Sequence, residues 1–177
     1  RAYNEEQHIE RLMLGIAAQR RQPFEIILVD SGSTDSTAAI ARAYGARVIP
    51  IAKSEFTFGR ALNVGCAEAR GDIFVFASAH VYPVFDTWLD RLVAPFEHPK
   101  VVLSYGRQRG DEVTKFSEHQ IFARWFPHVS ECHQQTYFCN NANCAVRRSA
   151  WEWQPYDEHV TGLEDLAWAK VAQARGG

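Results

Sequence analysis

No apolar run in this sequence approaches the roughly 20 residues that a helix needs to cross a bilayer. No leader-like segment precedes the first polar residues, so we expect the chain by itself to be soluble. An excess of positive charge is also lacking, because 19 Lys and Arg stand against 21 Asp and Glu and no basic stripe is present. Nucleic acid is therefore not an expected partner.

Cysteine is scarce, with four residues unevenly spread over 177. No two of them have the C-x-x-C spacing that is typical of a zinc site. A chain of this length can bury enough apolar surface to fold without disulfide bridges. We therefore expect a single domain over residues 1–177 in a reducing compartment, by default the cytoplasm.

Both ends of the sequence look cut. The chain opens on loop-to-helix chemistry without an apolar strand to lead into it, and it stops at Gly176 and Gly177 directly after a helical pattern. We therefore expect a fragment of a larger domain that lacks its first strand and a C-terminal region.

Apolar residues recur with two periods along the chain. Helical spacing predicts helices over residues 5–20, 37–44, 58–69 and 87–96, and a last helix that begins near residues 162–165. Short apolar runs predict strands over residues 24–29, 47–51, 73–77 and 101–105. The stretch from there to about Tyr137 is aromatic-rich and less regular.

Strands that alternate with helices at this spacing indicate βαβ units. Right-handed crossovers then give a doubly wound α/β fold, with a mostly parallel sheet and helices on both faces. Ligands of such sheets bind beyond the carboxyl ends of the strands, where the turns at residues 30–36 and 78–82 must lie. The sequence therefore predicts a binding site at this edge of the sheet.

Four segments, in their order and spacing, resemble glycosyltransferase family 2. They are residues 2–6 (AYNEE), 29–35 (VDSGSTD), 71–80 (GDIFVFASAH) and 164–165 (ED). Each segment alone is a weak signal, because a polar turn after a strand is common to all α/β folds. The four together span nearly the whole chain, and the resemblance implies the Rossmann-like GT-A fold.

In that family the first two segments bind the nucleotide of a sugar donor. The resemblance implies that Asp30 holds the base and Glu5 the base or ribose, through charge-assisted hydrogen bonds. Taken alone, Glu5 is as well explained by the helix dipole, and Asp30 by a turn-forming role. The substrate-binding set implied by the resemblance is Ala2, Tyr3, Glu5, Asp30, Ser31, Arg60, Ser78, Ala79 and Asn141.

Two members of this set have simple alternatives. Arg60 stands where the family often carries a basic residue that reaches the nucleotide, and a guanidinium suits diphosphate oxygens, although a solvated surface Arg also explains it. Asn141 belongs to an Asn-rich run that resembles the lining of the donor-sugar pocket, where amides read hydroxyl groups. A polar turn is the alternative for Asn141.

The main departure from the family pattern follows the strand at residues 73–77. Most members carry Asp-x-Asp there, which binds Mg²⁺ or Mn²⁺ together with the donor diphosphate. This sequence has Ser78, Ala79 and His80 instead, so the usual carboxylate site cannot be transferred. His80 matches the position of the family's metal ligand, and imidazole favours Mn²⁺ or another transition ion over Mg²⁺. Direct hydrogen bonding of His80 to the diphosphate, or capping of a turn, are the alternatives.

Inverting sugar transfer needs one general base to deprotonate the acceptor hydroxyl. In family 2 this base is the Asp of a Glu-Asp pair that opens a helix, which corresponds to Asp165 with Glu164 beside it. Adjacent acids at a helix start also satisfy the helix dipole without any function. The resemblance therefore implies an inverting hexosyl- or deoxyhexosyltransferase with Asp165 and Glu164 as its catalytic residues.

The expected substrates are a nucleotide diphospho-sugar and a glycan or lipid-linked acceptor, whose binding region belongs to the missing C-terminal segment. Residues 78–83 and 105–108 resemble a subset that includes rhamnosyltransferases, which implies bacterial cell-envelope polysaccharide synthesis at the cytoplasmic face of the membrane. Any peripheral membrane association would depend on segments outside this sequence. A nucleotide-sugar-binding module without catalysis is the alternative. A nucleotidyltransferase is less favoured, because residues 2–6 lack a Gly-rich basic phosphate loop.

Overall fold

The computed structural model describes residues 1–132 and 134–176, and the strands of these residues form two sheets. Strand β1 (Ile27–Asp30) pairs in parallel with β2 (Arg47–Pro50). In the second sheet β5 (Asn143–Arg147) lies between β3 (Ile73–Ala77) and β4 (Leu103–Tyr105). Since β5 is antiparallel to both neighbours, β3 and β4 run in the same direction.

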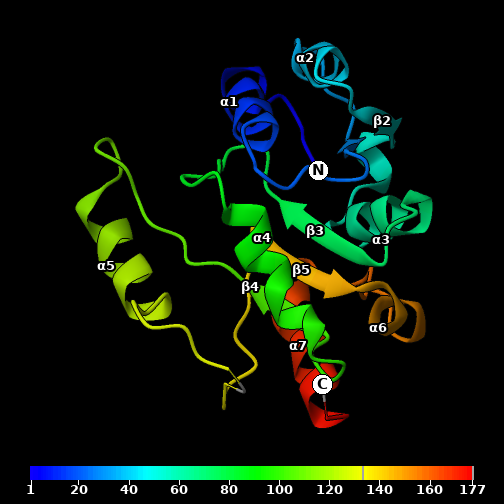
Figure 1. The fold of residues 1–177 in the computed structure, drawn as a ribbon. Coiled ribbons are helices and arrows are strands. Elements are labelled where there is room, and N and C mark those ends of the chain that lie inside the picture. Colours follow the sequence, from blue (N-terminus) through cyan, green and yellow to red (C-terminus); the bar gives the residue numbers. More distant parts are fainter. Residues whose placement is uncertain (133, 177) are drawn as a thin grey trace.

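The helices surround these strands (Figure 1). In chain order they are α1 (Glu6–Ala17), α2 (Thr37–Ala43), α3 (Phe58–Glu68), α4 (Trp88–Val93), α5 (Phe116–Trp125), α6 (Arg148–Trp153) and α7 (Glu164–Ala174), with single 3-10 turns η1 (Lys53–Glu55) and η2 (Ala94–Glu97). Helix α5 stands apart from the strands, between two long connections. Within the described residues no helix is long and apolar enough to span a membrane.

Helices cover both faces of the β3-β5-β4 sheet. Cys144 and Val146 of β5 pack with residues of α3, α6 and α7, whereas Ala145 points to the opposite face and packs with α4 and η2. Around β1, Leu28 belongs to a core shared with α1 and α2, and Val29 faces α3 at Gly65. The predicted α/β class with helices on both faces is confirmed.

Most predicted elements are present with shifted ends. The strand at residues 73–77 has the bounds that its apolar run predicts, while α1 ends at Ala17 instead of residue 20. Beyond Ala18, the amide of Gln19 donates to the carbonyls of Gly15 and Phe85, so this side chain joins the end of α1 to a distant loop. Strand β5 and helices α5 and α6 were not predicted from the sequence.

A groove lined by apolar side chains separates β1 from β3. It has a volume of about 490 Å³ and is lined by residues of α1, β1, α3 and β3. At one end of it Ala2 donates its N–H to the carbonyl of Val29 at 2.9 Å and accepts from the N–H of Ser31 at 3.0 Å, in a parallel bridge opposite Asp30. A strand that led into Ala2 along this direction would run between β1 and β3. The expected first strand therefore has a place in the fold, and its presence stays a prediction.

An apolar, β-branched segment of about five residues, a usual strand length, fused ahead of Arg1 is expected to pair with the facing edges of β1 and β3. Pairing of both edges and burial of apolar side chains should raise the Tm by several degrees in thermal unfolding. A Gly-Ser extension of equal length is the control. Equal Tm values for the two extensions would contradict the prediction.

Candidate functional site

Hydrogen bonds join the segment after Ala2 to the turn after β1. Asn4 donates its backbone N–H to Ser33 Oγ at 2.9 Å, and its side-chain oxygen accepts from the N–H of Thr34 at 2.8 Å. Asn4 has a φ of 52°, in the left-handed region that Asn tolerates better than most residues. Residues 2–6 and 30–36 therefore form one continuous surface beside the carboxyl end of β1.

The starts of α1 and α2 are tied to each other by Asp35. Its carboxylate accepts the backbone N–H groups of Glu6 at 3.1 Å and Thr37 at 3.0 Å. The hydroxyl of Thr37 in turn accepts the N–H of Glu5 at 2.7 Å. These bonds satisfy donors at two helix starts, and they fix where the side chain of Glu5 emerges.

Asp30 and Ser31, at the carboxyl end of β1, carry buried polar atoms without a protein partner. They are 6% and 3% exposed, and only one carboxylate oxygen of Asp30 is engaged, by the N–H of Ser33 at 3.2 Å. Asp30 Oδ1 and Ser31 Oγ have no hydrogen-bond partner among the described residues. Buried polar atoms are almost always paired, so these two are candidates for ligand contacts.

Tyr3, 41% exposed, is anchored beside this site by Lys53. The ammonium group of Lys53 donates to the hydroxyl of Tyr3 at 2.7 Å and lies 4.4 Å from the centre of its ring. The ring therefore has a fixed position and keeps exposed surface.

The turn after β3 contacts two of the other predicted segments. Ser78 donates its N–H to the carbonyl of Ala142 at 3.2 Å, and Ala79 is buried. His80 Nδ1 lies 3.2 Å from Glu5 Oε1, and the hydroxyl of Ser78 lies within 3.4 Å of the same ring. The structure thus brings Glu5, Ser78 and His80 together.

The carboxylate of Asp165, at the start of α7, is held by two backbone donors. Asn141 donates its N–H to Oδ2 at 3.2 Å, and Leu166 donates to Oδ1 at 2.8 Å. Burial raises the pKa of Asp165 above its ordinary value; the two N–H donors lower it, and the neighbouring Glu164 carboxylate adds to the rise. Asp165 is therefore a fixed carboxylate with more affinity for protons than an ordinary Asp.

The side chain of Asn141 is also fixed. Its oxygen accepts from the thiol of Cys144 at 3.1 Å and from the hydroxyl of Tyr156 at 3.3 Å. Its buried Nδ2 has no partner among the described residues. Asn141 therefore presents a donor beside Asp165.

Arg60 occupies a separate position at the rim. Its guanidinium lies 3.4 Å from a carboxylate oxygen of Glu158 and 3.6 Å from one of Glu55. Its backbone N–H donates to Thr57, which caps α3. Among the described residues, no recorded contact joins Arg60 to the other predicted site residues.

Arg1 is a site residue that the sequence analysis missed. Its guanidinium lies 3.2 Å from Glu164 Oε1 and 4.4 Å from the centre of the Phe58 ring. The available signal was a basic residue directly before the segment at residues 2–6. Arg1 joins this segment to the starts of α3 and α7.

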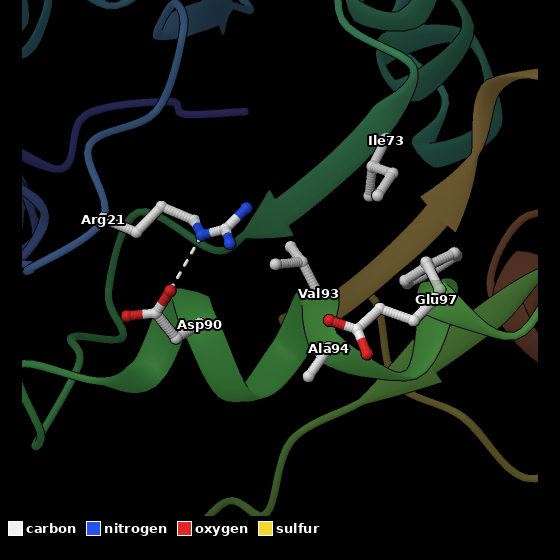
Figure 2. A pocket seen from close by; sticks show the side chains of 7 residues that line it. Arg21, Ile73, Asp90, Val93, Ala94 and Glu97 are labelled. Atoms are coloured by element: carbon white, nitrogen blue, oxygen red, sulfur yellow. Dashed lines mark hydrogen bonds and ion pairs between the residues drawn. The ribbon is translucent and has the colours of Figure 1, made fainter.

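The predicted residues other than Arg60 thus gather around the carboxyl ends of β1 and β3. In the described part of the chain no group of three His, Cys, Asp or Glu could hold a metal ion. A hollow of about 390 Å³ lies elsewhere, at the amino end of β3, where Arg21 contacts Asp90 at 2.8 Å (Figure 2). The hollow is lined by this ion pair, Glu97 and apolar side chains, and none of the predicted site residues lines it, so we do not assign the site to it.

Comparison with known proteins gives one family. Residues 1–153 match the family described as "Glycosyl transferase family 2". The O-antigen chain rhamnosyltransferase WbaN of Salmonella anatum is 30% identical over 161 residues, which cover 84% of this chain and 50% of that protein. Glycosyltransferase AglE of Haloferax volcanii is 26% identical over 184 residues, which cover 98% and 60% of the two chains. The chain therefore spans 50% to 60% of the length of these relatives.

Solved structures show the same fold. Glucosyl-3-phosphoglycerate synthase from Mycobacterium tuberculosis, in complex with Mn²⁺, UDP and glucosyl-3-phosphoglycerate, superposes with a TM-score of 0.71 at 27% identity over 99% of this chain and 64% of that one. The mannosyltransferase PcManGT from Pyrobaculum calidifontis, in complex with GDP-Man and Mn²⁺, gives a TM-score of 0.74 at 22% identity over 99% and 50%. The GT-A fold is confirmed.

Gly59, in the first turn of α3, is expected to be indispensable, because an added Cβ would collide with the backbone carbonyl of Asp157. Gly59→Ala should cost about 1–3 kcal/mol, at about 2–4 °C of Tm per kcal/mol for a chain of this size. Gly71→Ala is the control, since its Cβ would lie 3.7 Å from the nearest atom. Equal Tm values for the two variants would show that the segment carrying Glu158 does not pack on α3.

Proposed function

The chain belongs to glycosyl transferase family 2, and from this premise we propose that it is the donor-binding and catalytic part of an enzyme that transfers a sugar, with inversion, from a nucleotide diphospho-sugar to a hydroxyl acceptor. The observation that carries the proposal is the pair of buried, unpartnered atoms Asp30 Oδ1 and Ser31 Oγ at the carboxyl end of β1. Ligands of open α/β sheets bind at such an edge.

Asp30 binds the base of the donor nucleotide. Its free oxygen is an acceptor, which fits the ring N–H of uracil, thymine or guanine, whereas the cytosine ring carries no N–H at the corresponding position. Ala2 places the chain over Asp30, and the ring of Tyr3 gives the base a face to stack on. Glu5 accepts from the ribose or the base through Oε2, which leaves Oε1, the oxygen that faces His80, for a cation.

The residues after β3 fit a divalent cation in part. An imidazole nitrogen of His80 and a carboxylate oxygen of Glu5 lie 3.2 Å apart, so two ligands converge there, and diphosphate oxygens would supply others. This mixed donor set suits Mn²⁺ better than Mg²⁺, which prefers oxygen ligands only. When bound, the cation would stabilise charge on the departing diphosphate. Two structural neighbours were solved with Mn²⁺, which supports this part of the proposal.

Asp165 is the general base. Its carboxylate is held by the N–H groups of Asn141 and Leu166, and its raised pKa makes it a better proton acceptor than an ordinary Asp. It takes the proton of the acceptor hydroxyl as this oxygen attacks the anomeric carbon from the face opposite the diphosphate. The free amide donor of Asn141 beside it orients the donor sugar.

The acceptor class is a glycan or a lipid-linked saccharide of the cell envelope. The rhamnosyltransferase relative, named for the O-antigen chain, supports this choice. The reaction then takes place at the cytoplasmic face of the membrane. Arg60 contacts Glu55 and Glu158, and it would reach the diphosphate by turning away from them.

Thermal unfolding with UDP, dTDP, GDP or CDP, each with and without Mn²⁺, tests donor binding. A nucleotide at 100 times its Kd should add about 2.7 kcal/mol, which is roughly 5–11 °C of Tm, and CDP should add least. Asp30→Ala should abolish the shift, whereas the exposed Asp86→Ala should keep it. No shift with any nucleotide, or a shift that survives Asp30→Ala, would overturn the proposal.

Asp165→Asn should lower kcat, measured as release of nucleoside diphosphate from the donor, about 10²- to 10⁴-fold. It should leave the affinity for the nucleotide unchanged. Burial raises the pKa of Asp165, and a general base works only when it is deprotonated. When the pH is lowered, kcat of the parent protein should therefore begin to fall before the pH reaches about 3.9, the usual pKa of an Asp. A binding module would have no turnover to lose. An acid limb at or below the usual Asp value would argue against Asp165 as the base.

A further inference from the structure

The two adjacent acids at the start of α7 have different surroundings. Glu164 is 5% exposed, and its carboxylate contacts the guanidinium of Arg1 at 3.2 Å. Asp165 is half-buried and turns to the N–H of Asn141. Consecutive residues of a helix project about 100° apart, and the two carboxylates accordingly contact different partners.

The backbone just before α7 has two consecutive residues with positive φ. Leu163, which precedes the helix, has a φ of 61° and is exposed, and no side chain of the described residues caps the helix. Gly162 before it has a φ of 152°. The left-handed conformation is costly for Leu, so it persists only where neighbouring contacts hold the chain. Those contacts include the Arg1–Glu164 pair and the bond from the N–H of Asn141 to Asp165, which join the first turn to other parts of the chain.

Arg1 is itself held on two sides. Its guanidinium lies over the ring of Phe58 at the start of α3, and the residue that follows it, Ala2, pairs with β1. The pair therefore connects α7 to the segment that carries the proposed nucleotide site. Loss of Arg1 would leave the carboxylate of Glu164 buried without this partner, so that it would have to move towards solvent.

We infer that Arg1 and Glu164 form a positioning pair that fixes the first turn of α7, and with it the carboxylate of Asp165, relative to the donor site. Glu164 acts through Asp165 and takes no proton itself. Arg1 acts through Glu164 and does not bind the donor. The inference rests on the proposed function in so far as it takes Asp165 to be the base.

A double-mutant cycle with Arg1→Met and Glu164→Gln tests the pair. Glu164→Gln keeps the size and one acceptor oxygen, so it is the variant expected to fold. Each single change should lower kcat roughly 10- to 100-fold and speed amide hydrogen exchange at Leu166 and Ala167. The double variant should be no worse than the poorer single one, because both changes remove the same contact.

Binding of UDP and dTDP should change by less than about twofold in all these variants. The control pair is Arg21→Met and Asp90→Asn, an exposed ion pair away from the site, which should leave kcat and α7 exchange unchanged. Additive effects on kcat with unchanged α7 exchange would make Glu164 a catalytic residue and overturn the inference. Loss of UDP and dTDP binding in Arg1→Met would assign Arg1 to the donor and also overturn it.

The exchange measurement separates this inference from the proposed function. If the parent protein has no turnover, the proposed function fails, but exchange at α7 still reports whether the pair holds the helix. If Asp165→Asn abolishes turnover while Glu164→Gln and Arg1→Met leave both kcat and exchange unchanged, the proposed function stands and the positioning pair does not.

Discussion

The backbone pairing of Ala2 with the end of β1 is the interaction on which the site depends. Two hydrogen bonds fix one residue against Val29 and Ser31, and the chain on either side of it then has little freedom. Upstream, Arg1 is brought to the start of α7. Downstream, Glu5 is brought to His80, across the end of the groove between β1 and β3. A pairing between two main-chain segments thus determines where polar side chains from three parts of the sequence meet.

The antiparallel strand β5 organises the other half of the site. Because β5 runs against β3, the residues that precede β5 lie beside the residues that follow β3, and Ser78 bonds to Ala142. Asn141 therefore lies next to Asp165 and donates its backbone N–H to the Asp165 carboxylate. Packing of Cys144, Ala145 and Val146 on both faces of the sheet buries the middle of this strand and fixes its register.

The sequence predicted what local periodicity encodes. Strand β3 is a continuous apolar run, and α3 begins and ends near a capping Thr and a Gly, so both were found. Strand β5 was missed because Asn and Cys at its start resemble a polar turn, and its apolar faces depend on helices distant in sequence. In the site, the motif positions of Asp30 and Asp165 could be predicted by resemblance. The contacts of Arg1 with Glu164 and of His80 with Glu5 could not, since each joins side chains more than 70 residues apart in the sequence.

Asp30, Ser31 and Asn141 also bear on how this chain would respond to selection. Each is buried with an unpartnered polar atom, and such an atom makes a fold less stable than an apolar side chain of the same shape would. Variants enriched only for heat resistance should therefore acquire an apolar residue at Ser31, whereas Asp30 and Asn141 also accept hydrogen bonds from the protein that an apolar residue would lose. Natural sequences would then keep Ser31 because ligand binding requires it, not because the fold does.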